Sequence, residues 1–182
     1  MSEKLSVKKM VACALCLALA TVTGLIRLYQ FPFGGAVTLC SMLFVMLPGW
    51  FFGPVYGVVT GLGYGIIVFL TEPYFMSVPQ FLFDYVFAFS VMGVAGFFRK
   101  KPLLWGYLAA VFVRWIMATI AGLIWVKLGY TAWDGWSPLP YSAAYNGAYI
   151  FTEAAVTAVV ISIPAVKKAL EWAKRTSAEQ GG

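Results

Sequence analysis

Three ionisable side chains, Asp84, Arg114 and Glu153, lie inside long apolar stretches of this chain. A charged group at membrane depth is costly, so each of them needs a partner or a function there. One interpretation is a neutral structural network in which Arg114 pairs with Glu153 or with Asp84. The other gives Asp84 a ligand, because Tyr85 is its neighbour and Gln80 lies one helical turn away on the same face.

A carboxylate between an amide and a phenol, beneath aromatic loops, suits a polar aromatic cation. The carboxylate would supply charge-assisted hydrogen bonds, and the surrounding rings would attract the cation by stacking and cation–π contacts. We therefore predict a substrate-binding site built from Asp84, Tyr85, Gln80 and Glu153.

A second polar and aromatic cluster runs from Trp133 to Tyr149. Its key residue is Asn146, because an amide inside a helix can orient a ligand with both donors and acceptors. An interfacial belt of aromatic residues is the alternative interpretation. That alternative fits Trp136 and Tyr149, but it does not explain Asn146.

The composition indicates that these residues lie in a membrane. Of the 182 residues, 62% are hydrophobic and 11% are charged, whereas a soluble domain has about 25% charged residues. No charged residue occurs between Leu28 and Thr71, a stretch far longer than the roughly 20 apolar residues of one span. The chain is therefore predicted to be a single membrane-embedded domain over 1–182.

Several functional classes are not supported by the residues present. The chain has no histidine, and Cys13 and Cys16 are interpreted as small apolar groups in a helix rather than as a redox or zinc site. No nucleophile–base pair, metal-ligand set or G-x-x-x-x-G-K-[ST] loop stands out. The net charge of +6 comes from clusters beside the apolar stretches, which does not indicate nucleic acid. We predict a binding subunit that is not an enzyme, has no metal or cofactor, and needs partners.

The apolar stretches predict an all-α integral membrane protein with six transmembrane helices. Segments rich in Gly, Pro or polar residues separate them, including Pro48–Pro54, which divides the longest uncharged stretch. The second helix is short for a full span, and the basic tail over 167–182 has the composition of an interfacial helix anchored by Trp172. The expected helices are 7–28, 38–51, 54–70, 79–98, 103–128 and 142–166.

The lysines and arginines predict the orientation. Their clusters fall at 4–9, 99–101 and 167–175, which lie on one side of the membrane if the chain crosses six times. The positive-inside rule places that side, with both termini, in the cytoplasm. We therefore expect a multi-pass protein of the bacterial plasma membrane. The loops on the other side have few cations and many aromatic residues.

Small residues form two further patterns. Gly53, Gly57, Gly61 and Gly65 recur every four residues, and Ala14 and Ala18 make an A-x-x-x-A step. Such spacing places small side chains on one helix face, where another helix can approach closely.

Four segments, taken in order, resemble the thiamine-specific S component of energy-coupling factor (ECF) transporters: Pro32–Met42, Val78–Phe89, Phe98–Lys100 and Ser137–Tyr149. The resemblance extends over nearly the whole chain in length, span number and motif order. It implies a six-helix membrane fold with a pocket near the outer face, and thiamine as a transported ligand. It also implies an ECF transmembrane coupling subunit and two ATPase subunits as partners.

The resemblance implies a role for particular residues. The acidic residue that bonds the aminopyrimidine corresponds to Asp84, where other members can have the longer glutamate. A histidine of some members corresponds to a position near Ala118, and this chain has none there. Ala14 and Ala18 match the surface that docks on the coupling subunit. The remaining binding positions correspond to Tyr74, Tyr85, Gly122, Tyr141 and Asn146, with Trp125 or Trp133 as the stacking tryptophan.

Two alternative functions stay open at this point. The nearest is an S component for another vitamin or precursor, such as hydroxymethylpyrimidine or riboflavin, which would make less use of Asp84. The more distant alternative is an intramembrane enzyme or a stand-alone channel. Competition binding with a panel of vitamins separates thiamine from the other ligands. An enzyme would alter its bound ligand, and a channel would conduct solute without partner subunits.

Overall fold

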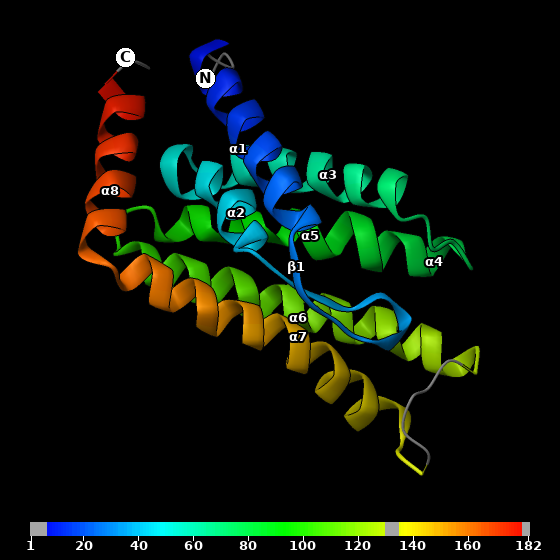
Figure 1. The fold of residues 1–182 in the computed structure, drawn as a ribbon. Helices are drawn as coiled ribbons and strands as arrows, with labels where there is room; N and C mark the ends of the chain where they lie inside the picture. The colour runs from blue at the N-terminus through cyan, green and yellow to red at the C-terminus, as the bar shows by residue number, and fades with distance from the viewer. Residues whose placement is uncertain (1–6, 130–134, 180–182) are drawn as a thin grey trace.

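The computed structural model describes residues 7–129 and 135–179, and its architecture is almost entirely helical (Figure 1). Five helical stretches within these residues are long and apolar enough to cross a membrane: α1, α3, the run from α4 to η3, α6 and α7. The elements in order are α1 Val7–Leu25, β1 Arg27–Gln30, η1 Pro32–Gly34, β2 Ala36–Thr38, α2 Ser41–Phe52, α3 Pro54–Thr71, α4 Val78–Phe81, η2 Leu82–Phe87, α5 Ala88–Ser90, η3 Val91–Phe98, α6 Leu103–Lys127, α7 Pro138–Ser162 and α8 Pro164–Glu179.

The short helix α2 forms the centre of the bundle. Every residue of α2 except Phe44 is buried, and it packs against α1, α3, η3 and α6. It contains Pro48, and the turn that separates it from α3 comes only at Gly53, whose φ is +115°. The sequence placed the start of this turn at Pro48. Glycine is suited to the positive φ at this position because it has no Cβ.

A two-stranded hairpin follows α1, and a purely helical prediction did not include it. The first helix was expected to reach residue 28 but ends at Leu25, and Thr38 belongs to β2 rather than to the second helix. The strands are antiparallel, with Arg27 opposite Thr38. Strands of three or four residues are too short to produce a clear periodic signal. Gly34, with a φ of +98°, allows the turn between them.

The glycine pattern in α3 is confirmed as a packing face. A Cβ on Gly61 would lie 2.1 Å from the carbonyl oxygen of Phe89, and one on Gly65 would lie 2.0 Å from that of Tyr85. A Cβ on Gly57 would lie 2.6 Å from the Cα of Gly93. Backbone meets backbone along this contact, so no larger residue fits without moving a helix.

The fourth span is irregular along its length. It was expected over 79–98 and extends over Val78–Phe98, starting where the Ser77 hydroxyl accepts a hydrogen bond from the amide of Gln80. Its second segment, η2, is a π-helix that contains Asp84, and its last segment, η3, is a 3₁₀-helix. A π-helical segment, whose turns are wider than those of an α-helix, is frequent at functional sites.

The last span ends earlier than predicted, and the helix expected in the basic tail follows it as α8. That span was expected over 142–166, but α7 starts earlier at Pro138 and ends at Ser162, and α8 begins at Pro164. Proline is favoured in the first turn of a helix, and it disfavours helical backbone in the residue before it. Ile163 is accordingly extended, with a ψ of 123°. In Figure 1, α8 runs across the direction of α6 and α7 at one end of the bundle.

Candidate functional site

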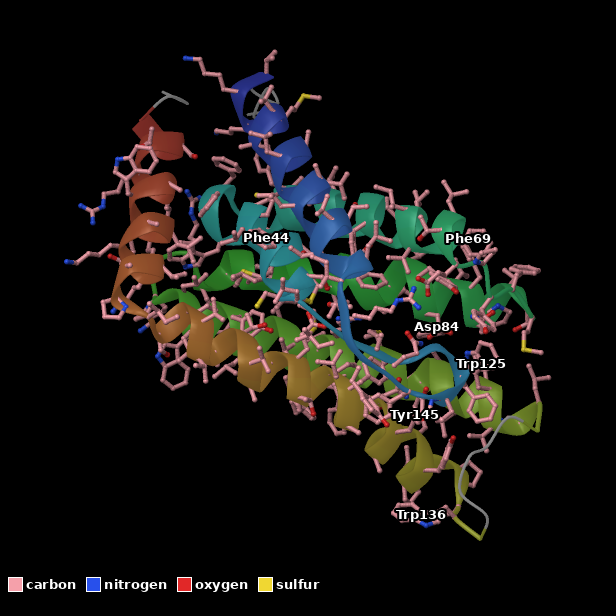
Figure 2. The ribbon with its side chains drawn as sticks, in the orientation of Figure 1. Phe44, Phe69, Asp84, Trp125, Trp136 and Tyr145 are labelled. Atoms are coloured by element: carbon pink, nitrogen blue, oxygen red, sulfur yellow. The ribbon has the colours of Figure 1, made fainter. Side chains whose placement is uncertain are left out.

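A cavity of about 210 Å³ lies between the hairpin and helices α1, α3, η2, α6 and α7. Figure 2 places its labelled residues Asp84, Trp125 and Tyr145 toward one end of the bundle, with α8 at the other. Its lining includes Arg27, the hairpin residues 33–36 and Glu72. Many ligand pockets have this character, with apolar and aromatic walls and a few convergent polar groups.

Asp84 lines the cavity and is held from two sides. Its Oδ2 accepts hydrogen bonds from Gln80 Nε2 at 2.8 Å and from Trp125 Nε1 at 2.7 Å. Both bonds fall on the same oxygen. Oδ1 accepts no hydrogen bond from the described residues and is therefore left for a ligand. The arginine pairing considered from the sequence is not the contact that fixes this carboxylate.

The neighbours of Asp84 make hydrogen bonds to the loop between α3 and α4. Gln80 has an exposed fraction of 0%, and it joins Asp84 to the backbone carbonyl of Tyr74 at 3.2 Å. The Tyr85 hydroxyl donates to the carbonyl of Glu72 and accepts from the amide of Tyr74. Both side chains therefore brace the loop between α3 and α4. The Tyr74 ring itself lies edge-on to Trp125, with ring centroids 5.9 Å apart.

Helix α7 supplies a row of tyrosines to the cavity wall, at the helical spacing 141, 145 and 149. The rings of Tyr141 and Tyr145 are stacked with centroids 6.0 Å apart. The sequence predicts Tyr141 as a binding residue and leaves Tyr149 open to the alternative of an interfacial belt, but it does not single out Tyr145. The signal that could have found Tyr145 is the four-residue spacing, which places all three rings on one helix face.

Asn146 is buried in the cavity wall, and its amide is oriented by its neighbours. Its Nδ2 donates to the carbonyl of Ser142 at 2.9 Å, and its Oδ1 accepts from the Tyr149 hydroxyl at 2.7 Å. Gly122 on α6 faces this group, since a Cβ there would lie 2.1 Å from Ser142 Oγ and 2.8 Å from Asn146 Nδ2. The glycine thus allows α6 and α7 to meet beside the cavity.

Arg114 and Glu153 both line the cavity but do not pair with each other within the described residues. The Arg114 guanidinium lies over the Phe89 ring, 4.6 Å from its centroid. Glu153 accepts hydrogen bonds from the segment Thr38–Met42 instead. The neutral network between these two charges, one of the interpretations from sequence, is not formed as a direct ion pair.

Further contacts hold the hairpin over the cavity. The Tyr145 hydroxyl accepts from the amide of Gly35 at 3.1 Å and donates to the carbonyl of Pro32. Arg27 of β1 also forms an ion pair with Glu72. The hairpin is therefore attached to α7 and to the end of α3.

The other predicted positions lie as follows. Ala118, near the expected family histidine, is buried in α6 and is not one of the described residues that line the cavity. Trp125 is the stacking candidate that reaches the cavity, whereas Trp133 lies outside the described residues. Ala14 and Ala18 are exposed on α1.

A helical bundle with several membrane-spanning helices around one polar, aromatic cavity defines a multi-pass membrane protein that binds a small molecule. The sequence model of the family described as "Thiamine transporter protein (Thia_YuaJ)" matches residues 10–171, and the chain belongs to that family. The resemblance found in the sequence is thereby confirmed, and so is the prediction of a transport protein rather than an enzyme.

One relative agrees with this assignment, and one solved structure has a similar fold. The chain is 25% identical over 181 residues to the thiamine transporter ThiT of Bacillus subtilis (strain 168), which covers 90% of this chain and 93% of that protein. The fold is similar to that of ThiT from Listeria monocytogenes, with a TM-score of 0.73 and 24% sequence identity. That comparison covers 85% of this chain and 91% of the other.

Proposed function

We propose that this chain is the thiamine-binding S component of an ECF transporter, which captures thiamine outside a bacterial plasma membrane. The observation that carries the proposal is the Asp84 carboxylate, fixed through Oδ2 by Gln80 and Trp125 with Oδ1 left for a ligand. A carboxylate held in this way can accept hydrogen bonds from an aminopyrimidine. Fixing it before the ligand arrives lowers the entropy lost on binding.

The aromatic walls supply the second part of the recognition. The edge-on pair Tyr74 and Trp125 and the tyrosine row of α7 both line the cavity. A positively charged ring system between such walls gains stacking and cation–π attraction. The proposed ligand contacts are Asp84, Tyr74, Trp125, Tyr141 and Asn146, with Tyr85, Gln80 and Gly122 as supporting residues.

The orientation in the membrane is part of the same proposal. The arginine and lysine residues at 99–101 lie at the same end as α8, because Lys174 of α8 donates a hydrogen bond to the carbonyl of Arg99. The cavity lies toward the other end (Figure 2). Basic residues at one end support a cytoplasmic position for that end and an outward-facing cavity. In this arrangement α2 serves as the sixth, centrally buried membrane segment.

Transport requires partners in this proposal. An ECF transmembrane coupling subunit would bind the exposed Ala14 and Ala18 face of α1, and two ATPase subunits would supply energy. Two bulky substitutions, Ala14→Trp and Ala18→Trp, should abolish uptake in liposomes that contain the full complex but leave thiamine binding unchanged. Leu108→Trp on the exposed side of α6 is the control, and it should leave both unchanged.

The ligand is tested by titration of the purified chain with thiamine, hydroxymethylpyrimidine and riboflavin, with tryptophan fluorescence as the signal. Thiamine should bind and should displace the other compounds. Tighter binding of riboflavin or hydroxymethylpyrimidine would overturn the thiamine assignment. Chemical change of the bound compound in mass spectra would indicate an enzyme, and solute flux through liposomes without partner subunits would indicate a channel.

A further inference from the structure

Glu153 makes a set of contacts that ligand binding does not explain. The residue is 3% exposed, and its carboxylate accepts four hydrogen bonds, all from the segment between β2 and the first turn of α2. Oε2 accepts from the Thr38 amide at 3.0 Å and from Thr38 Oγ1 at 2.6 Å. Oε1 accepts from Ser41 Oγ at 3.2 Å and from the Met42 amide at 3.1 Å.

These contacts use the full hydrogen-bonding capacity of the carboxylate. An ionised carboxylate has two oxygens with about four acceptor sites in total, and here each oxygen receives two donors. A ligand in the cavity could bond Glu153 only by displacing one of them. Asp84 differs, because both of its hydrogen bonds fall on one oxygen.

The start of α2 explains why an acidic group is needed here. The first amides of a helix have no partner within the helix, and α2 is buried, so water cannot supply one. Its N-cap residue, Cys40, makes no capping hydrogen bond with its side chain. A carboxylate from α7 meets this need, and its negative charge is favourable at the positive end of the helix dipole.

The same carboxylate controls where the hairpin leaves the core. Thr38 is the last residue of β2 and pairs with Arg27 of β1. Two other attachments of the hairpin, through Tyr145 and through the Arg27–Glu72 pair, lie at partly exposed positions. The bonds from Glu153 to Thr38 of the hairpin are also only partly buried. The same carboxylate is fixed to the core, however, by fully buried hydrogen bonds from Ser41 Oγ and the Met42 amide of α2.

We propose that Glu153 is a positioning residue that sets the closed position of the β1–β2 hairpin over the cavity and does not bind the ligand. This revises the prediction from sequence that placed Glu153 among the substrate contacts. Loss of the carboxylate should release the hairpin while the residues around Asp84 stay in place. The inference rests on the proposed function only where ligand release is measured.

The first test uses the ligand-free chain, so that it is independent of the ligand's identity. Hydrogen exchange of the amides in residues 27–38 is compared between the parent chain and Glu153→Gln. Loss of two charge-assisted bonds should make this exchange at least about ten-fold faster. The control is Thr157→Val on α7, whose buried hydroxyl has no hydrogen-bond partner among the described residues, and it should leave the exchange unchanged. Equal exchange in Glu153→Gln and the parent would overturn the proposal.

A double-mutant cycle gives a second reading from the hairpin side. Thr38→Val removes the shortest of the four contacts without touching α7, so it also serves if Glu153→Gln fails to fold. Its hairpin exchange should rise, and its effect should shrink when it is combined with Glu153→Gln, because the two side chains share one interaction. Fully additive effects would show that Glu153 acts on the hairpin by some other route.

The last measurement separates this inference from the proposed function. In Glu153→Gln the dissociation rate constant of thiamine should rise. The change in tryptophan fluorescence on thiamine binding should be the same as in the parent chain. If the parent chain does not bind thiamine, the proposed function fails while the exchange result still decides the role of Glu153. If Glu153→Gln binds thiamine with an unchanged dissociation rate constant although its hairpin is released, the hairpin does not close the cavity.

Discussion

The indole Nε1 of Trp125 donates a 2.7 Å hydrogen bond to Oδ2 of Asp84, joining α6 to the π-helical segment of the fourth span. Gln80 donates to the same oxygen from one turn before Asp84. The two donors orient the carboxylate and partly replace the water that it loses by burial. The acidic group of the cavity is therefore positioned before any ligand arrives.

Substitution of Asp84 by asparagine tests the charge itself. Asp84→Asn should weaken thiamine binding by about 1.5–3 kcal/mol, the range for a hydrogen bond to a charged group. Fluorescence titration of the purified chain measures the change in Kd. Glu171→Gln on α8 removes an acidic side chain far from the cavity and is the matched control. Unchanged affinity in Asp84→Asn would count heavily against the site.

Substitution of Trp125 by phenylalanine tests the donor separately from the ring. Trp125→Phe keeps an aromatic side chain but loses the N–H, and should weaken binding by about 0.5–1.5 kcal/mol. Trp125→Ala should cost more, since it also removes the wall beside Tyr74. Isothermal titration calorimetry measures both. Trp115→Phe is the control, because its indole donates to the Ala143 carbonyl and not to Asp84. If Trp115→Phe lost as much affinity as Trp125→Phe, the role of the Trp125 N–H in binding would be contradicted.

Gly122 allows close contact between α6 and α7 beside Asn146, so an added methyl group should disturb the site. In Gly122→Ala the new Cβ would meet Ser142 Oγ at 2.1 Å, and relieving such overpacking typically costs about 1–3 kcal/mol. Gly147→Ala is the control, because its nearest neighbour would be 3.4 Å away. Thermal unfolding and thiamine affinity are measured for both. Wild-type affinity in Gly122→Ala would show that this contact does not shape the cavity.

The docking of α8 should depend on pH through Lys174. Its ammonium lies 3.5 Å from the centroid of the Trp50 ring, and burial, with a smaller effect of Arg99, lowers its pKa to about 8 from 10.5. Docked α8 therefore holds fewer protons than undocked α8 between these two pH values. Docking should become more favourable as pH rises through this interval.

Spin labels on Ser177 and Lys100, in a chain whose native cysteines are replaced, measure the docking of α8 by their distance distribution. The distribution should narrow as pH rises above 8, and Lys174→Met should remove this dependence. A distribution that broadens with rising pH would mean that the attraction of the ammonium to Trp50 outweighs the cost of its burial.

Much of the fold could be predicted from local sequence. The apolar stretches located the long helices to within a few residues, and the four-residue glycine spacing in α3 marked a face that does pack on the fourth span. The hairpin was not predicted, and the break after the last span, expected at residue 166, comes at Ile163. Both occur where a few residues change direction, and such segments contain too few residues for periodicity to be read.

The site shows the same division. Sequence alone determined the membrane character of the chain, the family resemblance, and the pairing of Gln80 with Asp84, since helical spacing puts them on one face. Only the tertiary structure decided that Trp125 bonds Asp84, that Arg114 faces Phe89, and that Glu153 serves the hairpin. These contacts join residues far apart in the chain, and they depend on how helices pack. Packing is fixed by shape and distance in three dimensions, which spacing along one chain does not encode.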